Sequence, residues 1–148
     1  MSEKKKDIFV LTELFLRGFM KNMIRSVKEL DLPGAPQDMK VLMLTKKMPG
    51  VSIGEIVAET GRDKSQITRK IKDLEKRGFL RREAHAVDKR ISTLYLTEEG
   101  ELIAAQLEKT KKKVVSEMLG VLSDQEREDL AALLDKTLSR QDDGWGCK

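Results

Sequence analysis

The residue types best suited to recognise another molecule lie between Asp63 and Leu96. Ile67, Ile71 and Leu74 recur there at helical spacing, which predicts a helix with a single apolar stripe. At about 100° per residue, the opposite face carries hydroxyl, amide and basic groups: Ser65, Arg69, Lys72 and Lys76, with Gln66 at its flank. Such groups on one helix face can form hydrogen bonds with base edges in a DNA major groove. The pattern therefore predicts a helix that reads duplex DNA.

The distribution of charge supports the same interpretation. The chain of 148 residues has a net charge of +4. Between Arg62 and Arg90 it has eleven Lys or Arg against five Asp or Glu, a balance of +6, which leaves the rest of the chain at −2. A basic module on a neutral-to-acidic body is typical of a nucleic-acid-binding protein. The alternative is a merely solvated charged surface, which would explain the number of charges but not their segregation.

The helices predicted before the reading helix must position it. Residues 7–30 have apolar positions at spacings of three and four, which predicts a long helix that ends at the turn formed by residues 33–36. Residues 37–47 predict a second helix. The four residues from Ser52 have the form of a capping box and start a third. A turn that contains glycine follows, and Asp63 is a good N-cap for the reading helix, which completes a helix-turn-helix.

A hairpin is predicted directly after this helix. Gly78 suits the position just past a helix end. Residues 79–83 and 91–96 have strand character, while residues 85–90 are too polar and too many for a tight turn. We therefore expect two strands and a wing whose tip is charged: Asp88, Lys89 and Arg90.

Two more helices are predicted after the hairpin. Thr97 caps the first of them, which has a narrow apolar seam like that of a coiled coil over residues 103–121. Ser123 begins a second capping box. The last helix is expected to turn four leucines inward: Leu130, Leu133, Leu134 and Leu138. Residues 141–148 are expected to form a flexible tail.

Three stretches carry a resemblance to a known family. Asp88-Lys89-Arg90 and residues 94–100 (LYLTEEG) resemble the wing signature of the MarR family of bacterial transcription regulators. Residues 74–82 (LEKRGFLRR) resemble the stretch that precedes it. The resemblance is strong over residues 52–100. An aspartate and an arginine in the wing, followed at fixed spacing by this motif, are more specific than a helix-turn-helix alone.

The resemblance implies a fold and an assembly. The fold is mainly α with a small β-hairpin wing, that is, a winged helix-turn-helix with N- and C-terminal dimerisation helices. A single domain would span residues 1–148, with a DNA-binding lobe at 36–97 and dimerisation helices at 7–32 and 98–140. The chain would then act as an obligate homodimer that binds a pseudo-palindromic duplex as a repressor.

The resemblance also implies site residues. Five residues of the recognition helix would lie in the major groove: Ser65, Gln66, Thr68, Arg69 and Lys70. Lys72 is expected to contact phosphate or to remain in solvent. Arg90 would enter the adjacent minor groove, its guanidinium held by Asp88. Many relatives respond to small aromatic carboxylates or phenols bound between the dimer helices and the DNA-binding lobe, which implies a similar effector here.

The sequence offers little to other functional classes. It has no phosphate-binding glycine loop, no nucleophile elbow and no Cys/His ligand set, so we expect neither an enzyme nor a cofactor nor a metal. The one histidine, His85, is expected to be a solvent-exposed wing residue. Without a signal peptide or a long apolar run, a cytoplasmic protein that contacts no membrane is expected.

One alternative function stays open at this stage. A winged helix can also serve as a protein-interaction module whose basic face meets an acidic partner. That function would not require Ser65 and Gln66 beside Arg69, and it predicts little discrimination between duplex sequences.

Overall fold

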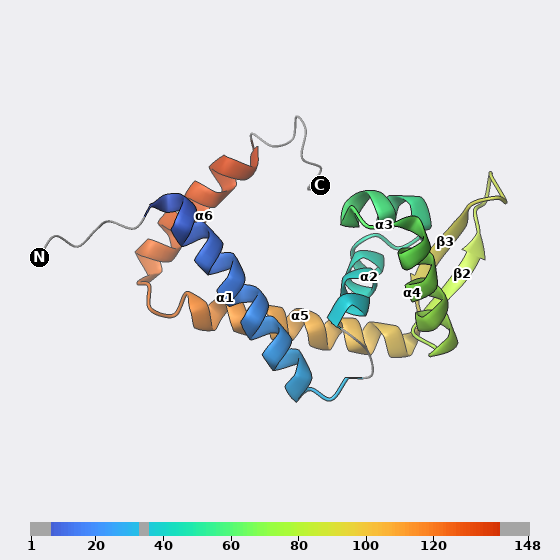
Figure 1. Cartoon of the computed structure of the whole chain (residues 1–148), viewed down its shortest axis with the longest axis horizontal. Helices are drawn as coiled ribbons and strands as arrows, with labels where there is room; N and C mark the ends of the chain where they lie inside the picture. Colours follow the sequence, from blue (N-terminus) through green and yellow to red (C-terminus); the bar gives the residue numbers. More distant parts are fainter. Residues whose placement is uncertain (1–6, 33–35, 140–148) are drawn as a thin grey trace, which may run out of the picture.

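The computed structural model describes residues 7–32 and 36–139. The chain is mainly helical, with one small antiparallel sheet (Figure 1), which confirms the predicted fold class. The elements follow in this order: α1 Ile8–Glu29, α2 Pro36–Lys47, β1 Val51–Ser52, α3 Ile53–Thr60, α4 Lys64–Lys76, β2 Leu80–Ala84, β3 Ser92–Leu96, α5 Glu98–Met118 and α6 Asp124–Ser139. None of the described helices is long and apolar enough to cross a membrane. The predicted tail at 141–148 lies outside the described residues.

The main hydrophobic core lies in one lobe, formed by α2, α3, α4 and the sheet. The side chains that fill it come from every element of the lobe: Val41, Leu42, Val51, Ile56, Ile67, Ile71, Leu74, Phe79, Leu80 and Leu94. The predicted stripe of α4 is included in full. Burial of this apolar surface is therefore what holds α4 in place against the lobe.

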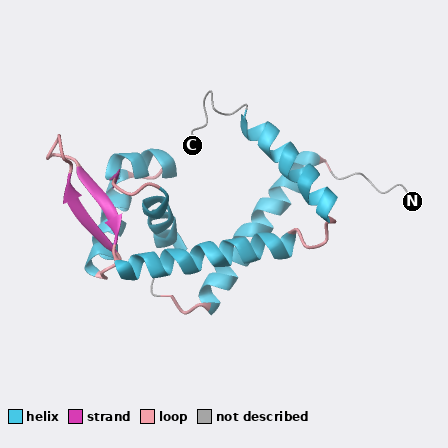
Figure 2. Cartoon of the chain, turned by 180° about the vertical axis from the view of Figure 1, so that it is seen from behind, coloured by secondary structure: helices cyan, strands magenta, loops and turns pink. Residues whose placement is uncertain are grey.

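The sheet has three strands rather than the two that we predicted. Its order is β1-β3-β2, and both pairs are antiparallel. The short strand β1 pairs Val51 with Leu94 and Ser52 with Thr93. A strand of two residues has no alternation of polar and apolar side chains, so the sequence pattern could not reveal it. Figure 2 shows the β2–β3 hairpin at one end of the molecule, and α6 and the start of α1 at the other.

Side-chain caps begin the helices where the sequence predicted them. The Ser52 hydroxyl accepts a hydrogen bond from the Glu55 amide at 3.1 Å, and the Glu55 carboxylate accepts one from the Ser52 amide at 2.7 Å. Thr97 caps α5 by accepting from the amide of Gly100 at 3.1 Å. Gly78 has a φ of 83°, the left-handed conformation expected just past a helix end.

Helix α5 joins the lobe to the rest of the chain, because it contacts both α2 and α1. At its start, Gly100 lies so close to the lobe that a Cβ there would be 2.1 Å from the carbonyl oxygen of Phe79. Only glycine allows this approach. The register of α5 against the lobe is therefore fixed at its first turn.

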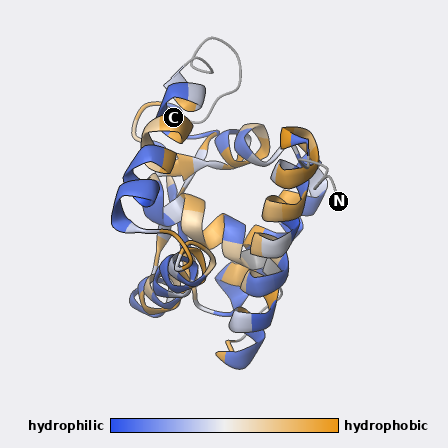
Figure 3. Ribbon diagram, turned by 90° about the vertical axis from the view of Figure 1, so that its left-hand side faces the viewer, coloured by the Kyte–Doolittle hydropathy of each residue, from blue (hydrophilic) through white to orange (hydrophobic). Residues whose placement is uncertain are grey.

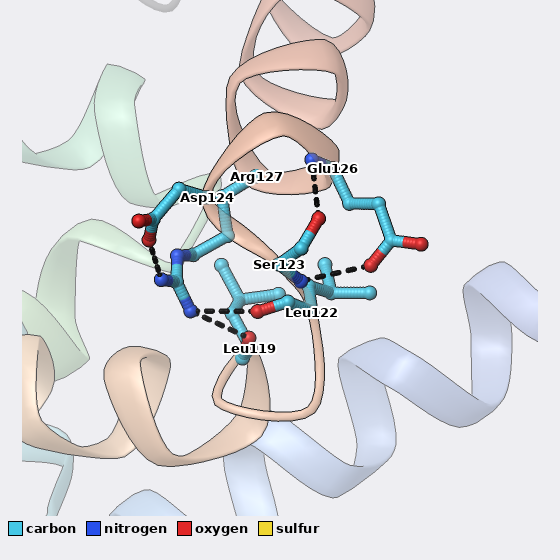
Figure 4. Close-up of polar contacts among 6 residues, drawn as sticks. All are labelled: Leu119, Leu122, Ser123, Asp124, Glu126 and Arg127. Atoms are coloured by element: carbon cyan, nitrogen blue, oxygen red, sulfur yellow. Dashed lines mark hydrogen bonds and ion pairs between the residues drawn. The ribbon is translucent and has the colours of Figure 1, made fainter.

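The turn between α5 and α6 is held by several polar contacts (Figure 4). Arg127 donates to the carbonyl oxygen of Leu122 at 2.9 Å and forms an ion pair with Asp124. Ser123 and Glu126 form the predicted capping box, with bonds of 2.8 and 3.2 Å. These contacts set the direction in which α6 leaves α5.

The outer helices leave their apolar sides uncovered. Val27 is the one buried residue in α1, and α6 has none. The prediction that the leucines of α6 face inward is wrong for the single chain, since Leu133 is 62% and Leu138 is 53% exposed. Figure 3 shows hydrophobic ribbon close to the N-terminus, where Phe9 and Phe15 are also exposed. Within residues 7–32 and 36–139, no other element covers these side chains.

Candidate nucleic-acid interface

Helix α4 presents one face to solvent and buries the other. Ile67, Ile71 and Leu74 are at most 1% exposed. The N-terminal end of α4 and the tip of the wing lie on the same side of the lobe (Figure 1). A helix end and a hairpin tip that point the same way could both contact one extended partner.

The first turn of α4 is fixed by its N-cap. The Asp63 carboxylate accepts hydrogen bonds from the amides of Ser65 at 2.7 Å and Gln66 at 3.3 Å. It also accepts one from the Ser65 hydroxyl. This hydroxyl bond, followed by the two amide bonds, lowers the pKa of Asp63. Because the Ser65 hydroxyl donates its proton to Asp63, it can only accept hydrogen bonds from other partners.

The predicted reading residues do not all occupy the same face. Four of them are exposed: Ser65, Gln66, Arg69 and Lys72. Thr68 is half-buried, and its hydroxyl donates to the carbonyl oxygen of Lys64 at 2.8 Å. Lys70 is also half-buried and has a partner of its own. The four exposed residues are therefore better placed than Thr68 and Lys70 to contact a ligand.

A shallow depression lies along the exposed face of α4. It is lined by residues from the first turns of the helix: Asp63, Lys64, Ser65, Thr68, Arg69 and Lys72. Lys64 was not among the predicted site residues, because its helical position does not lie on the polar face. At the first position of a helix, however, even a residue on that side can reach solvent, and Lys64 is exposed.

The wing carries the predicted charged tip, and Asp88, Lys89 and Arg90 are all exposed. The Asp88 carboxylate accepts a hydrogen bond from the backbone amide of Arg90 at 3.0 Å. We had expected this carboxylate to hold the guanidinium. In the structure the carboxylate binds the backbone amide instead, and the Arg90 guanidinium has no ion-pair partner among the described residues.

Three arginines in the basic module serve internal contacts. Arg82 binds the Glu75 carboxylate with two bonds of 2.9 and 3.0 Å, and this hydrogen bonding raises the pKa of Arg82. Arg77 pairs with Asp73 at 3.1 Å. Arg81 pairs with Glu83, and its guanidinium lies 4.6 Å from the centre of the Tyr95 ring. These arginines brace α4 and the sheet, so the charge available to a partner is smaller than the sequence count indicated.

Six other cations of the module have no ion-pair partner among the described residues, and all six are exposed: Lys64, Arg69, Lys72, Lys76, Lys89 and Arg90. They come from two elements only, α4 and the wing. Positive charges without internal partners attract a polyanion such as the phosphate backbone.

A separate cavity lies between α2 and α5. Its volume is about 910 Å³, and its apolar part includes Met43, Leu44 and Val115. Five lysines from the two helices also line it: Lys40, Lys46, Lys47, Lys111 and Lys112. A single acidic residue of the lining, Glu108, contacts Lys112 at 3.3 Å and Lys46 at 3.6 Å. Its pKa is lowered, chiefly by the hydrogen bond from Lys112.

Comparisons with known proteins agree with this geometry. A profile of the MarR family matches residues 30–91. The transcriptional regulator HosA of Escherichia coli O157:H7 is 31% identical over 139 residues, which cover 94% of this chain and 99% of that protein.

Solved structures share the fold. Wild-type MarR from E. coli in its apo form has a TM-score of 0.79 at 21% identity, over 92% of this chain and 99% of that one. A MarR family transcriptional regulator from Listeria monocytogenes, solved in complex with a 26mer DNA, has a TM-score of 0.74 at 23% identity, over 95% of this chain and 92% of that one.

These matches do not favour the alternative of a protein-interaction module. The similarity to HosA extends over nearly the whole of both chains, and the matched profile covers the helix-turn-helix, β2 and the tip of the wing. The chain belongs to the MarR family of winged helix-turn-helix transcriptional regulators.

Proposed function

We propose that this regulator binds duplex DNA with sequence specificity through α4 and the wing. The observation that carries the proposal is the set of six exposed cations on these two elements, which have no ion-pair partner among the described residues and lie beside the exposed Gln66. Arginine and glutamine can each form two hydrogen bonds with a purine edge, whereas lysines on the same face neutralise phosphates. Arg90 is suited to the narrow minor groove beside the major-groove site. The DNA complex of the Listeria relative supports this assignment.

We also propose that the chain works as a homodimer and as a repressor. The support for a homodimer is the apolar surface of α1 and α6, which is exposed among the described residues of the single chain. Residues 7–32 and 98–140 would form the dimerisation helices, and residues 36–97 the DNA-binding lobe. Two lobes related by a two-fold axis would bind half-sites about one helical turn apart, ~10 bp. Such a protein would act in the cytoplasm, on the chromosome.

Substitution of Arg69 tests the reading of bases. Binding sites are first selected from random duplex DNA, and affinities for a selected and a scrambled duplex are then measured by fluorescence anisotropy. Arg69→Ala should weaken binding to the selected site by about 1–3 kcal/mol more than binding to the scrambled one. Lys72→Ala should weaken both alike, because phosphate contacts carry no sequence information.

Lys109→Ala is the matched control, since Lys109 is exposed on α5, away from α4 and the wing. It should leave both affinities unchanged. An equal loss on both duplexes for Arg69→Ala would mean that the arginine contacts only the backbone, contrary to the proposal.

The cavity between α2 and α5 favours a second proposal, that an acidic aromatic effector regulates binding. An apolar floor would take a ring, and the surplus of lysines would take a carboxylate. Because the cavity lies between the lobe and α5, a ligand there could change the spacing of the two lobes. Benzoate should raise the melting temperature more than phenol does, and Val115→Glu, which adds a negative charge to the floor, should remove the difference. Equal shifts with both probes would contradict an acidic ligand.

A further inference from the structure

The wing holds a histidine that the DNA contacts proposed above do not use. His85 follows β2 directly, and its amide donates to the carbonyl oxygen of Ile91 at 2.9 Å, which closes the base of the wing. The sequence predicts a solvent-exposed wing residue, whereas in the structure His85 is half-buried. The imidazole turns toward the wing backbone and contacts it at two points.

Both contacts use the same ring nitrogen. Nδ1 accepts a hydrogen bond from the amide of Val87 at 3.2 Å and another from the amide of Asp88 at 3.1 Å. A nitrogen that accepts must carry a lone pair, so these two contacts require an Nδ1 without a proton, as in the neutral ring whose proton lies on Nε2. These bonds hold the chain at the wing tip, where the Val87 side chain is 89% exposed and contributes little packing.

The contact continues from the histidine to the charged tip. The Asp88 amide binds His85, and the Asp88 carboxylate in turn accepts from the amide of Arg90 at 3.0 Å. The Asp88 carbonyl oxygen also accepts from Ile91 at 3.0 Å. The backbone position of Arg90 therefore depends, through Asp88, on the imidazole of His85.

Protonation of the ring would break this arrangement. A proton on Nδ1 turns an acceptor into a donor that faces two amide N–H donors, so both bonds are lost. The charged groups of the wing are Asp88, Lys89 and Arg90, and β2 adds the Arg81–Glu83 ion pair. Opposite His85 lies Ile91, just before β3, and the next residue is Ser92, the first residue of β3; neither side chain titrates. A cationic ring would also attract the Asp88 carboxylate away from the Arg90 amide.

We propose that His85 is the positioning residue of the wing: its neutral imidazole holds Asp88 and Arg90 in the DNA-binding arrangement, and its protonation releases them. This inference rests on the proposed DNA-binding function. Histidine side chains change charge between about pH 5 and 8, so specific binding should weaken on mild acidification. The extra positive charge alone would have the opposite effect on DNA affinity, since it would strengthen the attraction to phosphate.

His85→Asn provides the decisive comparison. The Asn side-chain oxygen can accept from amides two and three residues ahead, as the imidazole does, but it does not titrate in this range. Affinity for a selected and a scrambled duplex is measured at about pH 8 and about pH 5.5, at constant ionic strength. For the wild type, the ratio of its affinity for the selected duplex to its affinity for the scrambled duplex should fall about tenfold on acidification.

The two variants should behave differently from the wild type and from each other. His85→Asn should keep its preference at both pH values, whereas His85→Ala should have the same reduced preference at both. A wild type whose preference is unchanged or increases on acidification would overturn the inference. So would a His85→Asn variant with the pH profile of the wild type.

A second measurement is independent of DNA. The chain has one histidine, so the imidazole nitrogens give unambiguous signals in ¹⁵N NMR. At about pH 8 the free protein should have the Nε2–H tautomer, and the amide signals of Val87 and Asp88 should shift together with the ring on acidification. An Nδ1–H tautomer would overturn the inference. If no variant bound any duplex at any pH, the proposed function would fall as well, whereas binding with identical pH profiles would overturn only the role of His85.

Discussion

The lobe and the outer helices α1 and α6 differ in how completely their apolar side chains are buried within one chain. In the lobe, α4 buries its whole apolar stripe, and Ile56, Ile71 and Leu94 are fully excluded from solvent. In α6, a helix of similar length, nothing is buried, and Leu133 and Leu134 are more than half exposed. The lobe thus completes its core within one chain, while the outer helices end in open apolar surface. Under the proposed function, the part that would contact DNA is already folded within one chain, whereas the part that would set the spacing of two lobes would be completed by a second copy.

The largest expected effect on stability comes from a substitution in the lobe, and a matched substitution in α6 provides the comparison. Ile71→Ala should lower the free energy of unfolding by about 2–5 kcal/mol, because it leaves a cavity in a closed core. Leu133→Ala should have little effect on the unfolding of the lobe and should instead weaken self-association. Urea unfolding at two protein concentrations separates the two outcomes. A large, concentration-independent loss for Leu133→Ala would contradict the contrast.

Replacing a glycine by alanine should have opposite effects on stability at the contact between α5 and the lobe and in the outer helix α1. Gly100→Ala would place its Cβ 2.1 Å from the Phe79 carbonyl oxygen, so α5 must shift against the lobe. We expect a loss of about 1–3 kcal/mol despite the better helix propensity of alanine. In α1, a Cβ at Gly18 would meet only the Met118 side chain, at 3.7 Å. Gly18→Ala should therefore gain up to about 1 kcal/mol, and thermal melts that ranked the two variants equally would refute this account.

The smallest expected effect concerns the N-cap of the recognition helix. The folded state lowers the pKa of Asp63, so its carboxylate stabilises the fold above the unfolded-state pKa, and this contribution is lost as pH falls through the folded-state pKa. Asp63→Ser keeps a cap that does not titrate. From about pH 6 to about pH 3, the urea midpoint of the wild type should fall slightly more than that of the variant. Parallel curves would mean that the ionised cap contributes nothing.

Local signals made the lobe predictable from its sequence. Ile67, Ile71 and Leu74 define a stripe at helical spacing, and Ser52, Asp63 and Thr97 are caps whose bonds reach only a few residues. The charged wing tip followed from composition and from the family resemblance.

Contacts between distant segments could not be predicted in this way. Strand β1 exists only because Val51 meets Leu94. Arg82 contributes to the basic charge balance of the sequence, but its guanidinium is bound by the Glu75 carboxylate on a neighbouring element. Leu133 is exposed in the single chain although its spacing predicts an inward position, because periodicity identifies an apolar face but not the surface that covers it.

The central claim is that two copies, joined through their outer helices, place two α4 helices on one duplex. Sedimentation of the protein with its selected site tests it most directly, using that site and versions with the half-sites moved apart by about 5 or 10 bp. The account predicts two chains on the selected duplex. It also predicts a large loss of affinity when a half turn rotates one half-site to the opposite face. One chain per duplex, with an affinity indifferent to the half-turn insertion, would contradict it.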